Sequence, residues 1–80
     1  LFIQLLYTMK KIKKIKIKLN GKNKSIDHGS SLNELVNNLN IPIKKVAIEF
    51  NKEIIDKKNI KKIKLDNNDV IEIVHFIGGG

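Results

Sequence analysis

Residues 14–19 alternate strictly between a lysine and an isoleucine or leucine. Successive side chains of a β-strand point to opposite faces, so this two-residue period puts the apolar side chains on one face and the lysines on the other. Asn20-Gly21 follows at once, and this dipeptide is a strong signal for a tight β-hairpin, because both turn residues adopt a positive φ. We therefore expect a half-buried strand over residues 14–19, paired with a second strand over residues 22–27.

One helix is predicted next along the chain. Ser31 and Glu34 have the spacing of a capping box, in which the serine side chain binds the glutamate amide and the glutamate side chain reaches back. Apolar residues then follow at the spacing of one helix face: Leu32, Leu35, Val36 and Leu39. We expect Pro42 to end this helix, because the residue before a proline is pushed away from helical angles.

The second half of the chain predicts three more strands. They cover residues 46–50, 54–55 and 70–76, with turns at 51–53 and 66–69. The last strand has apolar residues at positions on both faces, which is typical of a central strand covered on both sides. The predicted fold class is α+β in the order β-β-α-β-β-β, with one main helix packed on a mixed sheet of about five strands.

Length and composition exclude several kinds of function. Eighty residues favour one domain with little room for a deep catalytic cleft. The absence of cysteine excludes disulfides, thiolate metal sites and a cysteine nucleophile. The net charge is +8, and every basic residue is a lysine. Specific nucleic-acid binding usually uses arginine and clustered aromatic residues, so we attribute the charge to a lysine-rich proteome and expect no specific nucleic-acid partner.

Residues 1–8 are apolar and uncharged, and Met9 and two lysines follow them. A signal peptide has its positive charge before the apolar core, and the segment is far too short to span a bilayer. We expect residues 1–8 to be a disordered upstream extension and residues 9–80 to form the domain. No membrane segment is expected, and the predicted location is the cytoplasm.

No set of side chains in the sequence predicts catalysis. His28 and His75 have no serine or cysteine partner at a recognisable spacing, so we expect both to be structural. The acidic run at residues 66–69 is similar to a calcium-binding loop, but Val70 and Ile71 stand where that loop needs a ligand and a glycine. We expect no catalytic residue and no metal site, so the chain is predicted to be a carrier or substrate and not an enzyme.

The chain ends on Gly78-Gly79-Gly80, directly after the apolar run of the last predicted strand. Residues without a Cβ can pass through a channel where any side chain would clash. A flexible glycine tail therefore suits a chain whose terminal carboxylate is the reacting group. The competing interpretation is an ordinary frayed end.

Residues 72–80 read EIVHFIGGG and resemble the C-terminus of the thiamine-biosynthesis sulfur carrier family ThiS, where (I/V)-E-I-V-H-F-(I/V)-G-G-G is common. Residues 47–55 are similar to the family's A-(V/I)-E-x-N-x-x-(I/V)-(V/I) stretch. Residues 20–22 and 31–35 fall where the family has its first hairpin and its helix. The resemblance covers residues 9–80.

This resemblance implies a ubiquitin-like β-grasp fold and a sulfur carrier protein of thiazole formation in thiamine biosynthesis. The Gly80 carboxylate would be adenylated by a ThiF-like adenylyltransferase, which uses ATP and a divalent metal. Sulfide from a cysteine desulfurase relay would convert it to a thiocarboxylate for a ThiG-like thiazole synthase. The carrier would be a monomer when free and would bind no cofactor. Phe76 and Ile77 are the side chains nearest the glycines, so we expect them to bind the partner.

Other functions remain open at this point. The small subunit of molybdopterin synthase shares the fold and a Gly-Gly end, but it usually has a proline-rich approach that residues 74–77 lack. A related carrier for transfer-RNA thiolation or protein conjugation is a further alternative, and a small basic RNA-binding protein is one from another class. The chain departs from many family members in having Asn68 where they have glycine. Asparagine accepts left-handed angles, so we expect this turn to survive.

Overall fold

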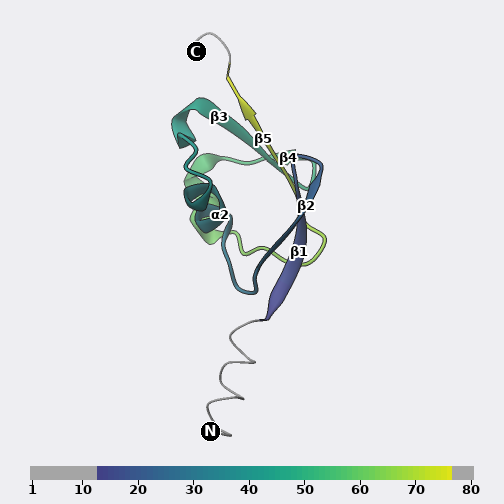
Figure 1. The fold of residues 1–80 in the computed structure, drawn as a ribbon. Coiled ribbons are helices and arrows are strands. Elements are labelled where there is room, and N and C mark those ends of the chain that lie inside the picture. Colours follow the sequence, from purple (N-terminus) through teal and green to yellow (C-terminus); the bar gives the residue numbers. More distant parts are fainter. Residues whose placement is uncertain (1–12, 77–80) are drawn as a thin grey trace, which may run out of the picture.

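The computed structural model of the chain describes residues 13–76 (Figure 1). The predictions for residues 1–8, for Ile77 and for the three glycines therefore lie outside the described residues. The elements are β1 (Lys14–Leu19), β2 (Lys22–Asp27), α2 (Leu32–Asn38), η1 (Ile43–Lys45), β3 (Val46–Phe50), β4 (Glu53–Ile54), η2 (Lys57–Lys62) and β5 (Val70–His75), where η marks a short 3-10 helix. The predicted order β-β-α-β-β-β is confirmed.

The strands form one mixed sheet in the order β2-β1-β5-β3-β4. Strand β5 is last in the sequence but lies at the centre, parallel to β1 and antiparallel to β3. The parallel pairing with β1 is short, whereas the pairing with β3 continues from Phe50↔Ile71 to Val46↔His75. The later part of β5 is therefore held mainly by β3.

Helix α2 lies on one side of the sheet, and the core fills the space between them (Figure 1). In β5, Ile71 and Ile73 face this core and are 0% and 7% exposed, whereas Val74 on the other face is 60% exposed. The prediction that β5 is covered on both sides is wrong. The described chain has one main helix, and it covers one face. We call the other side of the sheet the open face.

The capping box at the start of α2 is confirmed. The Ser31 hydroxyl accepts a hydrogen bond from the Glu34 amide at 3.1 Å, and the Glu34 carboxylate accepts one from the Ser31 amide at 3.3 Å. The helix ends at Asn38, earlier than the prediction from Pro42 implied. Asn40 adopts a left-handed φ of 56°, which reverses the chain before the proline is reached.

Two tight turns of the same type flank β5. Asn20 and Gly21 have φ angles of 51° and 81°, as the hairpin prediction requires, and Asn51 and Lys52 have φ angles of 49° and 72°. The second turn thus contains two residues and not the three expected, so β4 begins at Glu53. Lys52 occupies the position that glycine fills in the first turn.

The asparagines of these two turns also bind β5 with their side chains. The Asn20 side-chain oxygen accepts from the Ile73 amide at 2.8 Å, and the Asn51 side-chain oxygen accepts from the Val70 amide at 2.9 Å. Each side chain continues the hydrogen bonding of the sheet where a neighbouring strand has already turned. The central strand is therefore held from both sides.

The turn before β5 forms as expected, although Asn68 stands where many family members have glycine. Asn68 has a φ of 72°, in the left-handed region that asparagine tolerates. The Asp69 carboxylate accepts from the Asp66 amide at 2.7 Å and from the Asn51 side-chain amide at 3.1 Å. This turn is thereby tied to the turn between β3 and β4.

We expect Lys52→Gly to raise the free energy of unfolding by about 0.5–1 kcal/mol, because a left-handed conformation is strained for lysine and relaxed for glycine. The matched variant Gly21→Ala should lower it by about 1 kcal/mol. No atom lies within 4 Å of the Cβ position at Gly21, so this loss is conformational. Urea unfolding followed by far-UV circular dichroism measures both. A destabilising Lys52→Gly together with a neutral Gly21→Ala would refute this account of the turns.

Candidate functional site

The candidate site is the end of β5, where the chain leaves the sheet toward the terminal glycines. The Phe76 amide donates to the Lys45 carbonyl at 2.9 Å, one step beyond the pair formed by His75 and Val46. The backbone therefore stays in register with β3 up to Phe76. Only four residues, 77–80, follow in the sequence.

Lys57 stabilises this end of the sheet. Its partly buried ammonium group donates to the Ile43 carbonyl at 3.0 Å and to the Val46 carbonyl at 2.8 Å. The same nitrogen lies 5.4 Å from the centroid of the Phe76 ring, within the range of a cation–π contact. Lys57 thus connects η2, the start of β3 and the end of β5.

Sequence reasoning did not identify Lys57. It lies in the run at residues 57–62, which contains four lysines and looks like compositional bias. Nothing in that run distinguishes a lysine that binds carbonyl groups from one that faces water. Its acceptors, the carbonyls of Ile43 and Val46, are backbone groups that any residue carries, so no sequence signal marks the contact.

Three large apolar side chains are exposed within residues 13–76: Ile54, Val74 and Phe76, at 76%, 60% and 50%. Val74 lies opposite Ala47 on the open face, and Ile54 lies opposite Glu49 on the same face. Phe76, which was predicted to bind a partner, is therefore accessible beside the point where the chain leaves the sheet. Ile77, predicted with it, lies outside the described residues.

Two glutamates lie directly opposite each other on the open face. Glu49 of β3 is paired with Glu72 of β5, and like charges at such positions are destabilising. Within residues 13–76, one ion pair forms, between Lys14 and Asp27. No lysine in this range therefore forms an ion pair with either glutamate. This pair thus places two carboxylates without a close ion-pair partner beside exposed apolar side chains. We call Glu49, Ile54, Glu72, Val74 and Phe76 the acidic–apolar patch.

The two histidines are not brought together. His28 follows β2 and its amide donates to the Lys13 carbonyl, whereas His75 ends β5 at the opposite end of the sheet. Among residues 13–76, no group of three or more histidine and acidic side chains is placed to hold a metal ion. In the same range, no helix has the length and apolar character needed to cross a membrane.

Comparison with known proteins relates this site to one family. The sequence model of the ThiS family matches residues 17–80. The chain is 42% identical over 65 residues to the sulfur carrier protein ThiS of Bacillus subtilis, covering 80% of this chain and 98% of that protein. It is 39% identical over 66 residues to a thiazole synthase of Magnetococcus marinus, covering 82% of this chain. The chain spans 20% of the length of that enzyme.

A solved structure has the same fold. The crystal structure of the thiamine biosynthesis protein ThiS from Geobacter metallireducens superimposes with a TM-score of 0.73 at 25% sequence identity. The superposition covers 82% of this chain and 100% of that one. The predicted β-grasp fold is thereby confirmed.

We expect Lys57→Met to lower the free energy of unfolding by about 1–3 kcal/mol, because it removes two charge-assisted hydrogen bonds and leaves two carbonyls without a donor. The matched variant Lys58→Met removes a neighbouring exposed charge and should change stability by less than about 0.5 kcal/mol. Urea unfolding of both variants measures the difference. Equal effects would mean that Lys57 acts only as a surface charge.

Proposed function

This chain belongs to the ThiS family, and from that membership we propose that it is a sulfur carrier whose Gly80 carboxylate becomes a thiocarboxylate for thiazole formation in thiamine biosynthesis. The observation that carries the proposal is the extent of the match. It runs from residue 17 to residue 80 and so includes the three terminal glycines.

The chemistry follows from the reactivity of a carboxylate. A Gly80 carboxylate oxygen attacks the α-phosphorus of ATP, pyrophosphate leaves, and an acyl adenylate forms. Sulfide then attacks the acyl carbon, AMP leaves with the electron pair of the broken C–O bond, and a C–S bond replaces it. The chain has no cysteine, so this carboxylate is the available place to carry sulfur.

We assign the catalytic groups of these steps to a ThiF-like adenylyltransferase, which also brings ATP and a divalent metal. We place the reaction in the cytoplasm because it consumes ATP. Sulfide would come indirectly from a cysteine desulfurase relay.

A ThiG-like thiazole synthase is the proposed acceptor of the sulfur. The similarity to a segment of the Magnetococcus marinus thiazole synthase supports this assignment, because that enzyme contains a ThiS-like stretch within its own chain. Segments joined in one polypeptide are held at a high effective concentration. A separate carrier would deliver the same group by transient binding.

We propose the acidic–apolar patch as the surface that the activating enzyme binds. It begins at Phe76, next to the glycines, and continues along the open face through Val74 to Ile54. The opposed carboxylates of Glu49 and Glu72 lower the stability of the free chain, and a basic group of a partner placed between them would relieve their repulsion. The patch therefore fits an apolar partner surface that carries a lysine or arginine.

Incubation of the full chain with a ThiF-like adenylyltransferase, ATP, Mg²⁺ and sulfide should increase its intact mass by about 16 Da, as one oxygen is replaced by sulfur on the activated carboxylate. Deletion of Gly79 and Gly80 should abolish this gain while shifting the thermal midpoint by no more than about two degrees, because these residues follow the last strand. Gly79→Ala should bind the enzyme normally but be adenylated slowly. If the truncated chain still supports pyrophosphate exchange, the carrier function is refuted.

We expect Phe76→Ala or Ile77→Ala to weaken binding to the activating enzyme by about 1–3 kcal/mol, as for a truncated apolar anchor. At least one of them should do so without much loss of stability. Glu72→Gln should also weaken binding, yet raise the free energy of unfolding by about 0.2–1 kcal/mol, because it removes a like-charge pair. Glu53→Gln on the edge strand is the matched control. Calorimetric titration and thermal melts measure both quantities.

Affinity losses that merely follow the loss of stability would place recognition outside the acidic–apolar patch. The same conclusion would follow if Glu53→Gln and Glu72→Gln weakened binding equally. In that case the enzyme would sense overall charge and not the acidic–apolar patch.

A further inference from the structure

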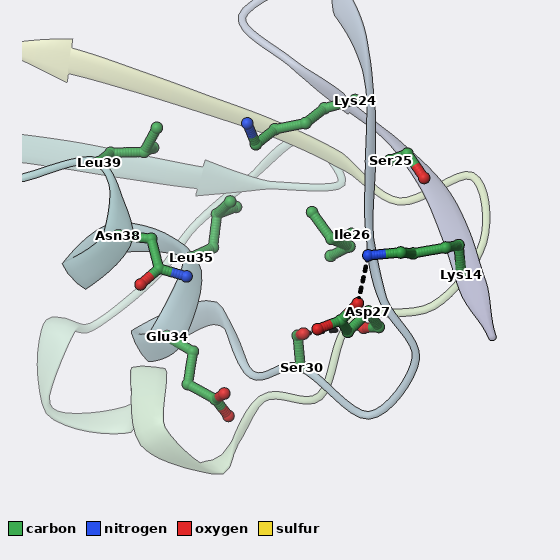
Figure 2. A pocket seen from close by; sticks show the side chains of 10 residues that line it. All are labelled: Lys14, Lys24, Ser25, Ile26, Asp27, Ser30, Glu34, Leu35, Asn38 and Leu39. Carbon is green, nitrogen blue, oxygen red and sulfur yellow. Dashed lines mark hydrogen bonds and ion pairs between the residues drawn. The ribbon is translucent and has the colours of Figure 1, made fainter. Parts of the chain in front are cut away.

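A groove separates β2 from α2 at the end of the sheet where β1 begins (Figure 2). The side chain of Ile26 points into it from β2, and those of Leu35 and Leu39 point into it from the helix and its C-cap. Lys14, the first residue of β1, also lines the groove. Because β5 runs parallel to β1, the end of β5 that leads to the glycines lies at the other end of the sheet.

Strand β2 borders this groove and is an edge of the sheet in the described part of the chain. In an antiparallel ladder, every second residue directs its N–H and C=O toward the partner strand. The His28 amide donates to the Lys13 carbonyl at 3.0 Å. The β2 residues whose backbone groups bind β1 are therefore those an even number of positions before His28. The backbone groups of Asn23 and Ser25 therefore point outward, where an additional strand could bind them.

The side chains along this edge combine apolar surface with positive charge. Lys24 is paired with the core residue Ile17, so it projects to the helix side of the sheet together with Lys22 and Ile26. Figure 2 shows Lys24 extending over the groove. Within residues 13–76 neither lysine forms an ion pair, since the recorded pair joins Lys14 and Asp27. The edge is thus apolar at Ile26 and positive at Lys22 and Lys24.

The acidic groups of the groove are already bound. Asp27 pairs with Lys14, and Glu34 accepts hydrogen bonds from the amide and hydroxyl of Ser31 in the capping box. Glu34 keeps its negative charge on the helix side of the groove, because its donors are neutral, whereas the charge without an ion-pair partner on the β2 side is that of Lys24. A ligand that complements it must carry a negative group beside apolar side chains.

We propose that the β2 edge docks an extended segment of a partner protein, which adds a strand beside β2, places apolar side chains in the groove and sets acidic side chains against Lys22 and Lys24. For antiparallel addition the segment meets Ile26 before Lys24 and Lys22, so its groove-facing residues are apolar first and acidic afterwards. A second copy of this chain fits poorly, because self-pairing of β2 would bring lysines together.

This surface is independent of the proposed sulfur chemistry. A segment bound at the β2 edge would leave the end of β5 free, because the two lie at opposite ends of the sheet. A partner could therefore hold the carrier by this edge while Gly80 reacts elsewhere.

A labelled peptide tests the proposal. Fluorescein-Thr-Leu-Thr-Val-Thr-Glu-Thr-Glu-Thr-amide alternates in period two and has apolar and then acidic groove-facing residues. It should bind the full chain in fluorescence anisotropy, and a peptide with lysine in place of each glutamate should not. Lys22→Glu with Lys24→Glu should weaken binding about tenfold or more. The matched pair Lys16→Glu with Lys18→Glu changes the same charge on the open face and should have a much smaller effect.

Ser25→Pro tests strand addition itself. It removes an outward N–H that the sheet does not use, which is the place where an edge strand tolerates proline, so it should abolish peptide binding while the melt stays near wild type. The Asn23 and Ser25 amides should also become protected from hydrogen exchange when the peptide binds. This exchange readout decides the question if the proline variant does not fold.

Three results would overturn the proposal. They are an absence of peptide binding, binding that survives both the lysine reversal and Ser25→Pro, and a dimer of the chain that Ser25→Pro dissociates, which would make a second copy the occupant. The intact-mass gain at Gly80 is measured on the variants of Lys22, Lys24 and Ser25. This mass gain should be unchanged. A failure of peptide binding at the β2 edge would therefore not refute the sulfur-carrier function, and a failure of the mass gain would not affect the interpretation of peptide binding.

Discussion

The structure depends on the position of β5, which is the last strand in the sequence and the central strand of the sheet. Its pairing with β1 joins Leu19 to Ile71, so the two ends of the domain meet in one ladder. Contacts between residues so far apart in the sequence carry a large entropy cost of loop closure, which the contacts must offset. The hydrophobic core is completed only when Ile71 and Ile73 take their places between β1 and β3. The strand that completes the fold is thus the strand that leads to the terminal glycines.

Two asparagines make this arrangement possible. Strand β1 ends at its turn while β5 continues, and β3 begins its own turn beside the start of β5. The side chains of Asn20 and Asn51 accept the β5 amides that these turns leave unpaired. An unpaired amide in a half-buried strand costs about 1–3 kcal/mol. The same residues adopt the left-handed angles of the turns, so asparagine meets a conformational and a hydrogen-bonding requirement at one position.

The sequence predicts those parts of the fold that depend on local interactions. The hairpin at Asn20, the capping box at Ser31 and the alternation in residues 14–19 each need only neighbours along the chain, and each is confirmed. The predictions that failed depend on tertiary structure. Whether Val74 is covered depends on how many helices pack on the sheet, and the apolar character of Val74 alone does not predict that number. The two-residue turn at Lys52 is set by the register of β3 with β4.

The same distinction between local and tertiary information applies to the candidate site. Gly78, Gly79 and Gly80 are recognised from sequence because a run of glycines after a strand is unusual. The pairing of Glu49 with Glu72 cannot be recognised, because it requires knowing which residues of β3 and β5 lie opposite each other. Two carboxylates at directly opposite positions repel each other, and these two lie on the open face beside exposed Val74, in the surface that we propose the activating enzyme binds. A basic group of the partner placed between them would remove this repulsion on binding.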